Sequence, residues 1–299
     1  LKLPVMGMIA NYEEPEDGRL ITQAQPRSPV AEAYRGLRTN VQYASVDNPL
    51  RTLLVTSPAP GDGKTSVVAN LATVMSQAGK QVTVVDADLH RPRVHSAFKL
   101  DSRPGLSSLF IKPEIYLNGS LQATASEKLR VVAAGELPPN PSELLGSNKM
   151  REILSTVLER SEMVLVDTPP VLSVTDAVVL APMVDGVLIV VKPGITHMSA
   201  LKVAVEQLRY VGANIIGVVI NGIESSGGRY GYYYKSYYYK QYKYYGTGGQ
   251  AARGKVKKGK KAGLSRVISL GRKPETVQKS NGTRKAEPAR RAEETRTEE

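Results

Sequence analysis

The sequence predicts an α/β fold in which a mostly parallel central sheet carries helices on both faces. Strand and helix signals alternate along the chain from residue 52 onward. Several predicted strands are continuous apolar runs, such as Val187–Val191, which is typical of parallel strands buried on both faces. A glycine-containing loop between the first of these strands and the next helix indicates a fold of the phosphate-loop NTPase type.

The predicted strands are short and apolar, and the helices between them carry one apolar stripe each. Thr52–Ser57 is a β-branched run that ends before Pro58. Thr65–Ala78 has apolar residues at the spacing of one helix face, and Gly79 closes it. Further strands are expected at Gln81–Asp86, Leu129–Ala133, Met163–Asp167, Gly186–Lys192 and Ile215–Asn221, and further helices at Glu143–Arg160, Thr175–Met183 and Ser199–Val211.

Composition divides the 299-residue chain into a folded part and a basic end. Residues 1–228 carry a net charge of −1, whereas residues 229–299 hold 19 basic and 6 acidic residues, a net of +13. We therefore expect four regions: residues 1–50, a phosphate-loop domain at 51–224, a tyrosine cluster at 225–249 and a basic tail at 250–299. The last two contain too little apolar surface to offset the entropy of ordering, so their composition predicts disorder.

Composition also excludes several classes of function. The chain has no cysteine, which excludes disulfides, thiol nucleophiles and thiolate metal sites. Three scattered histidines, His90, His95 and His197, make a zinc site unexpected. No apolar run reaches the ~18 residues that a membrane-spanning helix needs. The pI of 9.7 raises nucleic acid as a partner, but this applies only to the basic end of the chain.

The most unusual segment is a run of tyrosines interspersed with lysines between Arg229 and Gly246. It has no aliphatic residue, no strand alternation and no helical stripe, so it cannot bury one face in a core. We interpret its phenol hydroxyls as phosphate acceptors. The cluster holds 10 of the 15 tyrosines of the chain: Tyr230, Tyr232, Tyr233, Tyr234, Tyr237, Tyr238, Tyr239, Tyr242, Tyr244 and Tyr245.

The loop from Ser57 to Thr65 follows a strand and opens a helix, which is the setting of a phosphate loop. Backbone amides at the helix start bind phosphate oxygens, Lys64 would reach the β- and γ-phosphates, and Thr65 would place a hydroxyl on Mg²⁺. The usual first glycine is replaced by Pro58, and the competing interpretation is a chance Gly-Lys-Thr at a helix start. The nucleotide-binding candidates are Pro60, Gly61, Asp62, Gly63, Lys64, Thr65 and Ser66.

Carboxylates follow two of the predicted strands. Asp167 ends a buried strand, which in an α/β sheet places it at the carboxyl edge beside the phosphate loop, where an acid can hold Mg²⁺. Asp86 and Asp88 end another strand and lie on the same side if that strand continues. The alternatives are a turn-forming role for Asp167 and a capping role for Asp86 and Asp88. His90 is interpreted as a surface residue rather than a base.

Together with the tyrosine cluster, these motifs resemble the bacterial tyrosine kinases of capsule and exopolysaccharide synthesis, over about residues 1–245. The resemblance implies an ATP-dependent autokinase with Mg²⁺, whose domain is residues 51–224 and which phosphorylates its own tyrosine cluster in trans. It implies that Asp86 polarises the attacking hydroxyl and that Asp88 and Asp167 organise Mg²⁺. Asn221 resembles the residue that holds adenine in related ATPases. His90 stands where the family usually has arginine, and Arg91 follows it.

The family resemblance also implies partners. Glu32, Arg35 and Arg38 match the Glu-x-x-Arg-x-x-Arg helix that packs against the next subunit of a ring, although the same spacing also fits a solvated salt-bridged face. Residues 1–50 would then form a linker and this oligomerisation helix. Further implied partners are a membrane-spanning polysaccharide chain-length regulator, fused or separate, and a cognate phosphatase. The start at Leu1 and the likeness of Leu1–Ile9 to a linker favour a fragment of a fused protein at the cytoplasmic face of the plasma membrane.

Two other functions compete with the kinase interpretation. Partitioning and septum-positioning ATPases carry a second phosphate-loop lysine at the position of Ala59, which this chain lacks. Alternatively, the tyrosines and basic residues of the tail could stack on single-stranded RNA or lie on anionic lipid, making the chain a binding ATPase. Nucleic acid is not the expected partner, because the domain itself carries no excess positive charge.

Overall fold

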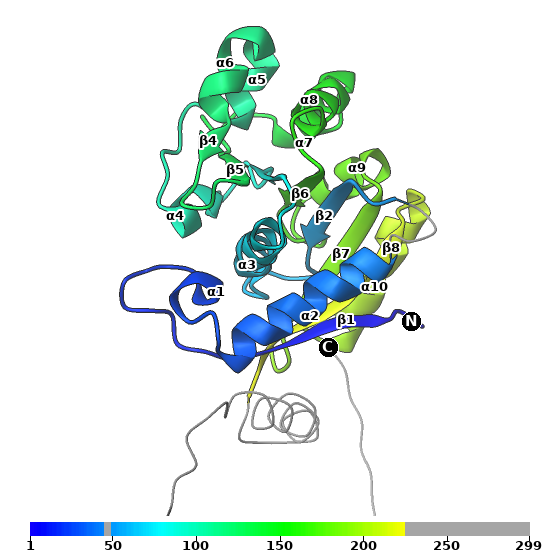
Figure 1. Ribbon diagram of the computed structural model, residues 1–299. Coiled ribbons are helices and arrows are strands. Elements are labelled where there is room, and N and C mark those ends of the chain that lie inside the picture. Colours follow the sequence, from blue (N-terminus) through cyan, green and yellow to red (C-terminus); the bar gives the residue numbers. More distant parts are fainter. Residues whose placement is uncertain (45–48, 225–299) are drawn as a thin grey trace, which may run out of the picture. The chain divides into compact units, whose positions relative to one another are not determined.

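The computed structural model describes residues 1–44 and 49–224, so the tyrosine cluster and the basic tail lie outside the described residues. Within them the strands form an eight-stranded sheet in the order β1-β8-β7-β2-β6-β3-β5-β4 (Figure 1). All neighbours are parallel except β4 and β5. The strands are β1 Val5–Ala10, β2 Thr52–Thr56, β3 Val82–Asp86, β4 Gln122–Ala123, β5 Leu129–Val132, β6 Met163–Asp167, β7 Gly186–Val191 and β8 Ile215–Ile223.

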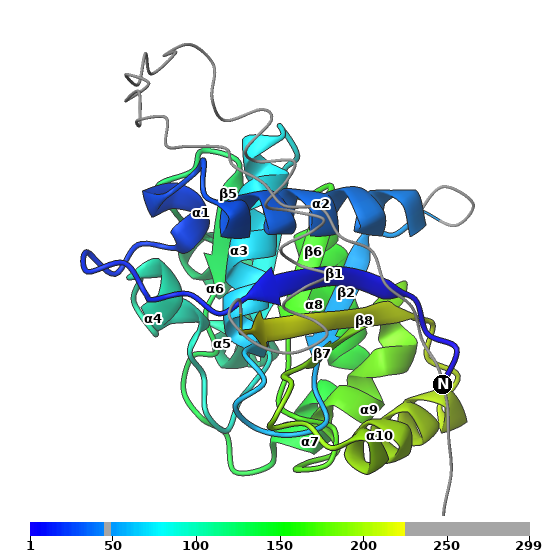
Figure 2. The same ribbon diagram turned by 90° about the horizontal axis from the view of Figure 1, so that it is seen from below.

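Helices cover both faces of this sheet, with a separate hydrophobic core on each. Strand alternation sends Leu53 and Val55 into the core under α2 and α3, and Leu54 into the core under α8, α9 and α10. In Figure 2, α2 and α10 lie on opposite sides of the strands. The helices are α1 Ile21–Ala24, α2 Pro29–Ala44, α3 Lys64–Gln77, α4 Val94–Phe98, α5 Leu106–Ile111, α6 Pro113–Ser120, α7 Pro141–Leu145, α8 Asn148–Leu158, α9 Asp176–Leu180 and α10 Met198–Tyr210, and a 3-10 turn spans Ala181–Met183.

The predicted fold class is confirmed, and two predicted helices are interrupted. The helix expected at Glu143–Arg160 is divided into α7 and α8, because Ser147 caps the second helix by accepting a hydrogen bond from the Met150 amide at 3.3 Å. The helix expected at Thr175–Met183 is α9 followed by the 3-10 turn, which contains Pro182 and its missing amide donor.

The N-terminal segment contains a strand that the linker interpretation did not include. β1 pairs with β8 in parallel, with Met6 and Ile9 buried in the core beneath α2. Gly7 allows α2 to approach the strand closely, because a Cβ atom there would lie 3.2 Å from the Cβ of Leu37. Helix α2 therefore packs on β1 and on α3 at the same time (Figure 1).

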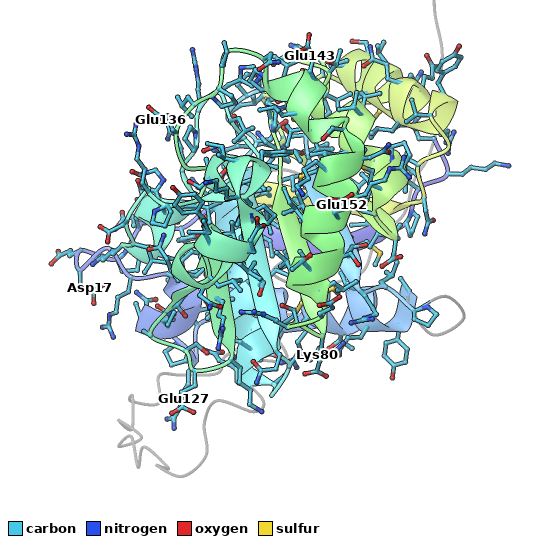
Figure 3. The ribbon with its side chains drawn as sticks, turned by 90° about the horizontal axis from the view of Figure 1, so that it is seen from above. Asp17, Lys80, Glu127, Glu136, Glu143 and Glu152 are labelled. Carbon is cyan, nitrogen blue, oxygen red and sulfur yellow. The ribbon has the colours of Figure 1, made fainter. Side chains whose placement is uncertain are left out.

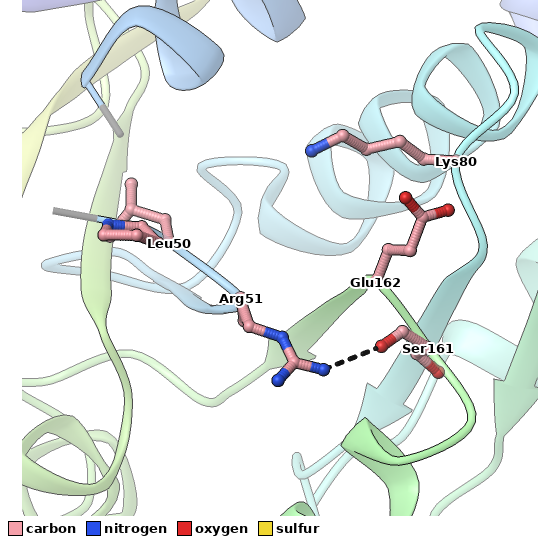
Figure 4. Close-up of a pocket in the computed structure, with 6 residues that line it drawn as sticks. Leu50, Arg51, Lys80, Ser161 and Glu162 are labelled. Carbon is pink, nitrogen blue, oxygen red and sulfur yellow. Dashed lines mark hydrogen bonds between the residues drawn. The ribbon is translucent and has the colours of Figure 1, made fainter. Parts of the chain in front are cut away.

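A small cavity lies at the amino ends of the strands, away from the phosphate loop. Its volume is about 350 Å³, and Pro49–Arg51, Lys80, Ser161 and Glu162 line it just before β2, β3 and β6 begin (Figure 4). Arg51 closes one side by donating to the carbonyl of Ser161 at 3.3 Å. Ligands of open α/β sheets bind at the carboxyl ends of the strands, so this cavity is not the nucleotide site.

Candidate active site

The phosphate loop connects β2 to α3 and depends on two glycines. Gly61 and Gly63 have φ angles of +87° and +86°, a left-handed conformation that glycine adopts without strain. A Cβ atom on Gly63 would also lie 2.2 Å from Nδ2 of Asn221. Since the residue before α3 has no side chain to cap it, the first amides of this helix stay available for an anion.

Asp62, in the middle of the phosphate loop, holds the loop in place through its side chain. Its buried carboxylate accepts hydrogen bonds from the Thr196 hydroxyl and from the Ala59 amide, the latter at 3.3 Å. Burial raises the pKa of Asp62 above its ordinary value, against these hydrogen bonds. Asn221 donates its side-chain amide to the carbonyl of Asp62 at 2.9 Å. Asn221 therefore supports the loop from β8, a contact that its expected adenine role did not include.

Lys64 opens α3 and is almost completely buried, with 9% of its surface exposed. Burial lowers the pKa of its ammonium group, and the carboxylates of Asp167 and Asp88 oppose this lowering. Lys64 lines the large cavity from this buried position. A contact between its charge and a bound phosphate would be strong there, because little water is present to screen the interaction.

Asp86 and Asp167 lie opposite each other at the ends of β3 and β6. Both are buried, with 0% and 1% of their surfaces exposed. Burial, together with the charge of Asp167, raises the pKa of Asp86 well above its usual range. Burial raises the pKa of Asp167 to about 7, against the Thr65 hydrogen bond and the charge of Lys64. A buried acid pair of this kind is typical of a site that binds a cation or moves a proton.

The surroundings of the acids fit a magnesium ion. The Thr65 hydroxyl donates to Oδ2 of Asp167 at 2.6 Å, while Oδ1 of Asp167 is buried without a hydrogen-bond partner among the described residues. Asp88 lines the same cavity. Hydroxyl and carboxylate oxygens are the ligands that Mg²⁺ prefers, and the unpartnered oxygen is the group that a bound cation would satisfy.

Asp88 follows the end of β3 instead of continuing it. β3 ends at Asp86, whose carboxylate accepts the amides of Asp88 at 3.2 Å and Val94 at 3.0 Å. Oδ1 of Asp88 in turn accepts the amides of His90 and Arg91. Asp86 and Asp88 therefore do not alternate along one strand, because the chain leaves β3 at Ala87 and the two carboxylates hold the segment that follows. The capping role that the sequence left open for these two acids is thus present, in addition to their place in the candidate active site.

His90 joins this turn to the other side of the cavity. Its Nε2 lies 3.1 Å from Oδ2 of Asp176 at the start of α9, while 38% of its own side chain stays exposed. Asp176 is fully buried and also accepts a hydrogen bond from Ser142. His90 is thus a surface residue, as expected, with one anchored end. A long-range partner of this kind leaves no signal in the local sequence.

The structure places the predicted oligomerisation residues on α2, away from the acids. Glu32 and Arg35 form an exposed ion pair at 2.7 Å. Arg38 instead donates to the carbonyl of Val74 in α3 at 3.0 Å. The three residues therefore do not form one uniform solvated face, because the last of them contacts the phosphate-loop helix.

A second feature that the sequence did not indicate is Tyr12. Its hydroxyl lies 3.1 Å from the Ser66 hydroxyl in the first turn of α3. The fully buried Tyr34 of α2 lies beside these two groups. The segment after β1 therefore reaches the nucleotide-binding loop, 54 residues further along the chain.

One cavity of about 1260 Å³ is lined by Lys64, Thr65, Asp88, His90 and Tyr12, whereas the buried Asp86 and Asp167 are not among its lining residues. Its lining includes the phosphate loop, Asp88 and residues of the Pro169–Val174 segment after β6. The carboxyl ends of the parallel strands meet here, which is where α/β folds bind their ligands.

Comparison with known proteins agrees with this geometry. The family model of ParA, described as NUBPL iron-transfer P-loop NTPase, matches residues 49–225. The tyrosine-protein kinase YwqD of Bacillus subtilis is 39% identical over 215 residues, which cover 72% of this chain and 90% of YwqD. The chain belongs to the bacterial tyrosine-protein kinase family. The putative tyrosine-protein kinase CapB of Staphylococcus aureus is 35% identical over 216 residues, covering 72% of this chain and 94% of CapB.

Solved structures of the family superpose on this kinase. The kinase domain of the Escherichia coli tyrosine kinase ETK matches with a TM-score of 0.71 and 30% identity, covering 76% of this chain and 92% of that one. The chimerical protein CapA2B2 matches with a TM-score of 0.70 and 37% identity, covering 75% and 96%. Both the predicted fold and the predicted tyrosine kinase activity are therefore confirmed.

Other relatives are much longer than the region they share with this kinase. Etk of Escherichia coli K12 is 34% identical over 198 residues, covering 66% of this chain but only 27% of Etk. An apo McdA structure matches with a TM-score of 0.50 at 19% identity, which shows a shared fold alone. The partitioning-type alternative is supported by the ParA family model, whereas the relatives YwqD and CapB are named tyrosine-protein kinases.

Proposed function

We propose that this tyrosine kinase transfers the γ-phosphate of ATP to the C-terminal tyrosine cluster of a neighbouring subunit. This autophosphorylation controls the polymerisation and export of an exopolysaccharide or capsule. The observation that carries the proposal is the buried pair of Asp86 and Asp167 at the ends of β3 and β6. Asp167 accepts a hydrogen bond from Thr65, and Thr65 and Lys64 line the large cavity. The chain itself supplies a cluster of acceptor tyrosines.

The phosphate loop binds the nucleotide in this mechanism. The first amides of α3 and the Lys64 ammonium group hold the phosphate oxygens and neutralise the charge that develops on them. Thr65, Asp88 and Asp167 would hold Mg²⁺, which supplies charge neutralisation on the phosphates when bound. Thr196 and Asn221 keep the loop in position through Asp62.

Asp86 acts on the acceptor. The tyrosine hydroxyl attacks the γ-phosphorus, the bond to the leaving oxygen breaks, ADP departs and the phenolic proton passes to the Asp86 carboxylate. The raised pKa of Asp86 makes this carboxylate a better proton acceptor than an ordinary aspartate. The amides of Asp88 and Val94 hold it in one orientation.

The relatives support part of the proposed set of partners. Etk and EpsB are much longer than the matched region, and one matching structure is that of a chimerical protein, CapA2B2. We propose that this kinase works in a ring with a membrane-spanning chain-length regulator, fused or separate, at the cytoplasmic face of the plasma membrane, and that a cognate phosphatase reverses the reaction. No helix among residues 1–44 and 49–224 is long and apolar enough to cross a bilayer.

The test is to incubate the purified full chain with Mg²⁺ and ATP and to locate phosphotyrosine by mass spectrometry. We expect phosphate on the residues between Tyr230 and Tyr245, and a rate that rises with enzyme concentration because transfer occurs between subunits. Phosphate confined to tyrosines outside this cluster would contradict the proposed acceptor. A rate per molecule that does not depend on concentration would contradict transfer in trans, provided that the chain is monomeric at the start.

A further inference from the structure

The cavity that begins at the phosphate loop continues well beyond it. Its volume of about 1260 Å³ exceeds the roughly 300–1,000 Å³ of a pocket for one small ligand. Beyond the phosphate loop, Asp88 and the Pro169–Val174 segment, its lining comes mainly from the segment before α1 and from the segment that contains α4. This second part of the cavity has room for a group other than the nucleotide.

Basic side chains dominate the second part. Glu14 is its one acidic lining residue within the described chain. We call the following four lining residues the basic wall: Arg19, Arg91, Arg93 and Lys99.

Two members of the basic wall are already fixed by the loop that faces α4. Arg19 pairs with Asp17 at 2.6 Å, and Lys99 donates to the backbone carbonyl of the same residue. Figure 3 shows Asp17 at the outer edge of the folded part. These contacts join the two sides of the cavity at its outer end, next to Gly18.

The other two members are free to bind a ligand. Arg91 and Arg93 are exposed, and their guanidinium groups have no hydrogen bond or ion pair within the described residues. The backbone amide of Arg91 donates to Asp88 at 2.9 Å, which ties both arginines to the turn that carries this acid. Guanidinium groups match phosphate oxygens with two parallel hydrogen bonds, so the wall suits a phosphate group better than a single negative charge.

We propose that the basic wall is a binding subsite for phosphotyrosine. It holds a tyrosine of the cluster that has already been phosphorylated while another tyrosine of the same tail reacts at Asp86. The inference rests on the proposed autokinase function, which supplies the phosphotyrosine. The basic wall takes no part in the phosphate transfer from ATP to tyrosine and only binds its product, phosphotyrosine.

The charge of the tail explains why the subsite would select the modified form. Residues 229–246 contain four basic residues and no acidic one, so the unmodified segment is repelled by the wall. Each phosphate adds about −1.5 to −2 charges at neutral pH. The cluster places its tyrosines side by side, so a bound phosphotyrosine keeps further acceptors close. The first phosphotyrosine of a tail therefore favours phosphorylation of its neighbours.

The test measures binding without turnover. The full chain is dephosphorylated and its phosphate loop is filled with Mg²⁺ and a non-hydrolysable ATP analogue. A fluorescent peptide of residues 229–246 is then titrated, unmodified or carrying phosphotyrosine at Tyr238, and its anisotropy is followed. We expect the phosphopeptide to bind about tenfold more tightly than the unmodified peptide. We expect Arg91→Gln combined with Arg93→Gln to remove this preference.

The matched control is Arg130→Gln combined with Arg151→Gln, which removes the same charge from exposed positions outside the cavity. This variant should bind both peptides like the wild type. Equal binding of the two peptides by the wild type, or an equal loss in the control, would overturn the proposal. Tighter binding of the phosphopeptide when the ATP analogue is left out would also overturn it, because the peptide would then be competing for the phosphate loop.

Free phosphotyrosine gives a second test that needs no variant. It should compete with the phosphopeptide for the wild-type chain, whereas free tyrosine should not, and equal competition by both would contradict the subsite. Failure of autophosphorylation in Mg²⁺ and ATP would remove the proposed function while leaving this binding result unchanged. The two hypotheses can therefore fail separately.

Discussion

Two acids of the candidate active site, Asp86 and Asp167, are buried close together, an arrangement that costs free energy when no ligand is bound. Asp86 and Asp167 meet across two neighbouring strands in a buried position, and only one of their four oxygens lacks a partner among the described residues. Two buried carboxylates repel each other, and Lys64 offsets only part of this. The pair therefore favours either a proton or a cation.

Lys64→Met should abolish phosphotyrosine formation while leaving the fold intact. Loss of one charge contact to the transferred phosphate costs roughly 10²–10³-fold in rate. The measurement is the initial rate of phosphotyrosine formation, with circular dichroism to check folding. Lys80→Met is the matched control, since Lys80 lies in the small cavity at the other edge of the sheet. A Lys64→Met variant with an undiminished rate would exclude Lys64 from the mechanism.

The raised pKa of Asp167 predicts how stability depends on pH. Because the folded protein holds this proton up to about pH 7, and an ordinary aspartate loses it near about pH 4, the folded state binds more protons within that window. Without Mg²⁺ the unfolding free energy should therefore fall as pH rises through the window, by up to about 1.4 kcal/mol per pH unit for this group.

Urea unfolding at several pH values, without Mg²⁺ or nucleotide, measures this slope. Asp167→Asn should reduce it, because its amide does not titrate, and Asp86 accounts for part of the slope that remains. Asp101→Asn, at an exposed position, should leave the slope unchanged. In the wild type, added Mg²⁺ should stabilise more strongly above about pH 7, where the carboxylate is charged. Equal slopes in the wild type and Asp167→Asn would show that Asp167 is not the titrating group.

At this scale the sequence predicted the residues that follow strands and missed those that reach across the fold. The sequence identifies the loop glycines, Lys64 and the acids at the strand ends, because these residues occupy fixed positions in a strand, loop and helix that follow one another. Thr196 contacts Asp62 across 134 residues, and no local pattern marks such a partner. Free guanidinium groups in a cavity, such as that of Arg93, likewise need the folded chain to be recognised.

Among the elements, α2 is the one with two roles. It covers β1 and also contacts α3, which begins at Lys64. Six of the eight strands in the described residues were predicted, because continuous apolar runs identify buried parallel strands, whereas β1 and the two-residue β4 were not. The short helices α1, α4 and α5 were not, because four to six residues are too few for a helical stripe to show.

Helix α2 gives a prediction that separates assembly from stability. Glu32→Ala combined with Arg35→Ala removes an exposed ion pair worth about 0–1 kcal/mol and an exposed hydrogen bond from Arg35 to the Pro26 carbonyl. The unfolding free energy should therefore fall by about 1 kcal/mol at most. If this face contacts a neighbouring subunit, the mass by light scattering should fall from a ring to monomers, and autophosphorylation should slow.

Arg38→Ala is the comparison. It removes a hydrogen bond to the Val74 carbonyl and should cost about 1–2 kcal/mol in unfolding free energy. An unchanged mass in the Glu32 and Arg35 variant would show that this face is merely solvated. A loss of stability in that variant as large as in Arg38→Ala would contradict the separation of roles.

The whole molecule joins a nearly neutral catalytic domain to a strongly basic end. The net charges of −1 for residues 1–228 and +13 for residues 229–299 are a property of the sequence alone. The fold places Asp88 and the basic wall around one cavity, so the same opening offers negative charge near Asp88 and positive charge near Arg93. The tyrosine cluster, predicted as the acceptor, lies outside the described residues.

The last prediction concerns charge as a switch of assembly. Phosphorylation of about seven of the ten clustered tyrosines would add about −10 to −14 charges, against the +13 of residues 229–299. We expect the unmodified tail to bind acidic surfaces of the neighbouring subunit or the membrane, and a tail that carries about seven phosphates, more than the one that the basic wall binds, to be released so that the ring opens. Because the number of phosphates matters more than their positions, single Tyr→Phe changes should barely alter the mass by light scattering after reaction with ATP. Replacement of all ten should keep the ring assembled. A single change, such as Tyr238→Phe, that alone prevents disassembly would contradict charge counting and identify a specific docking residue.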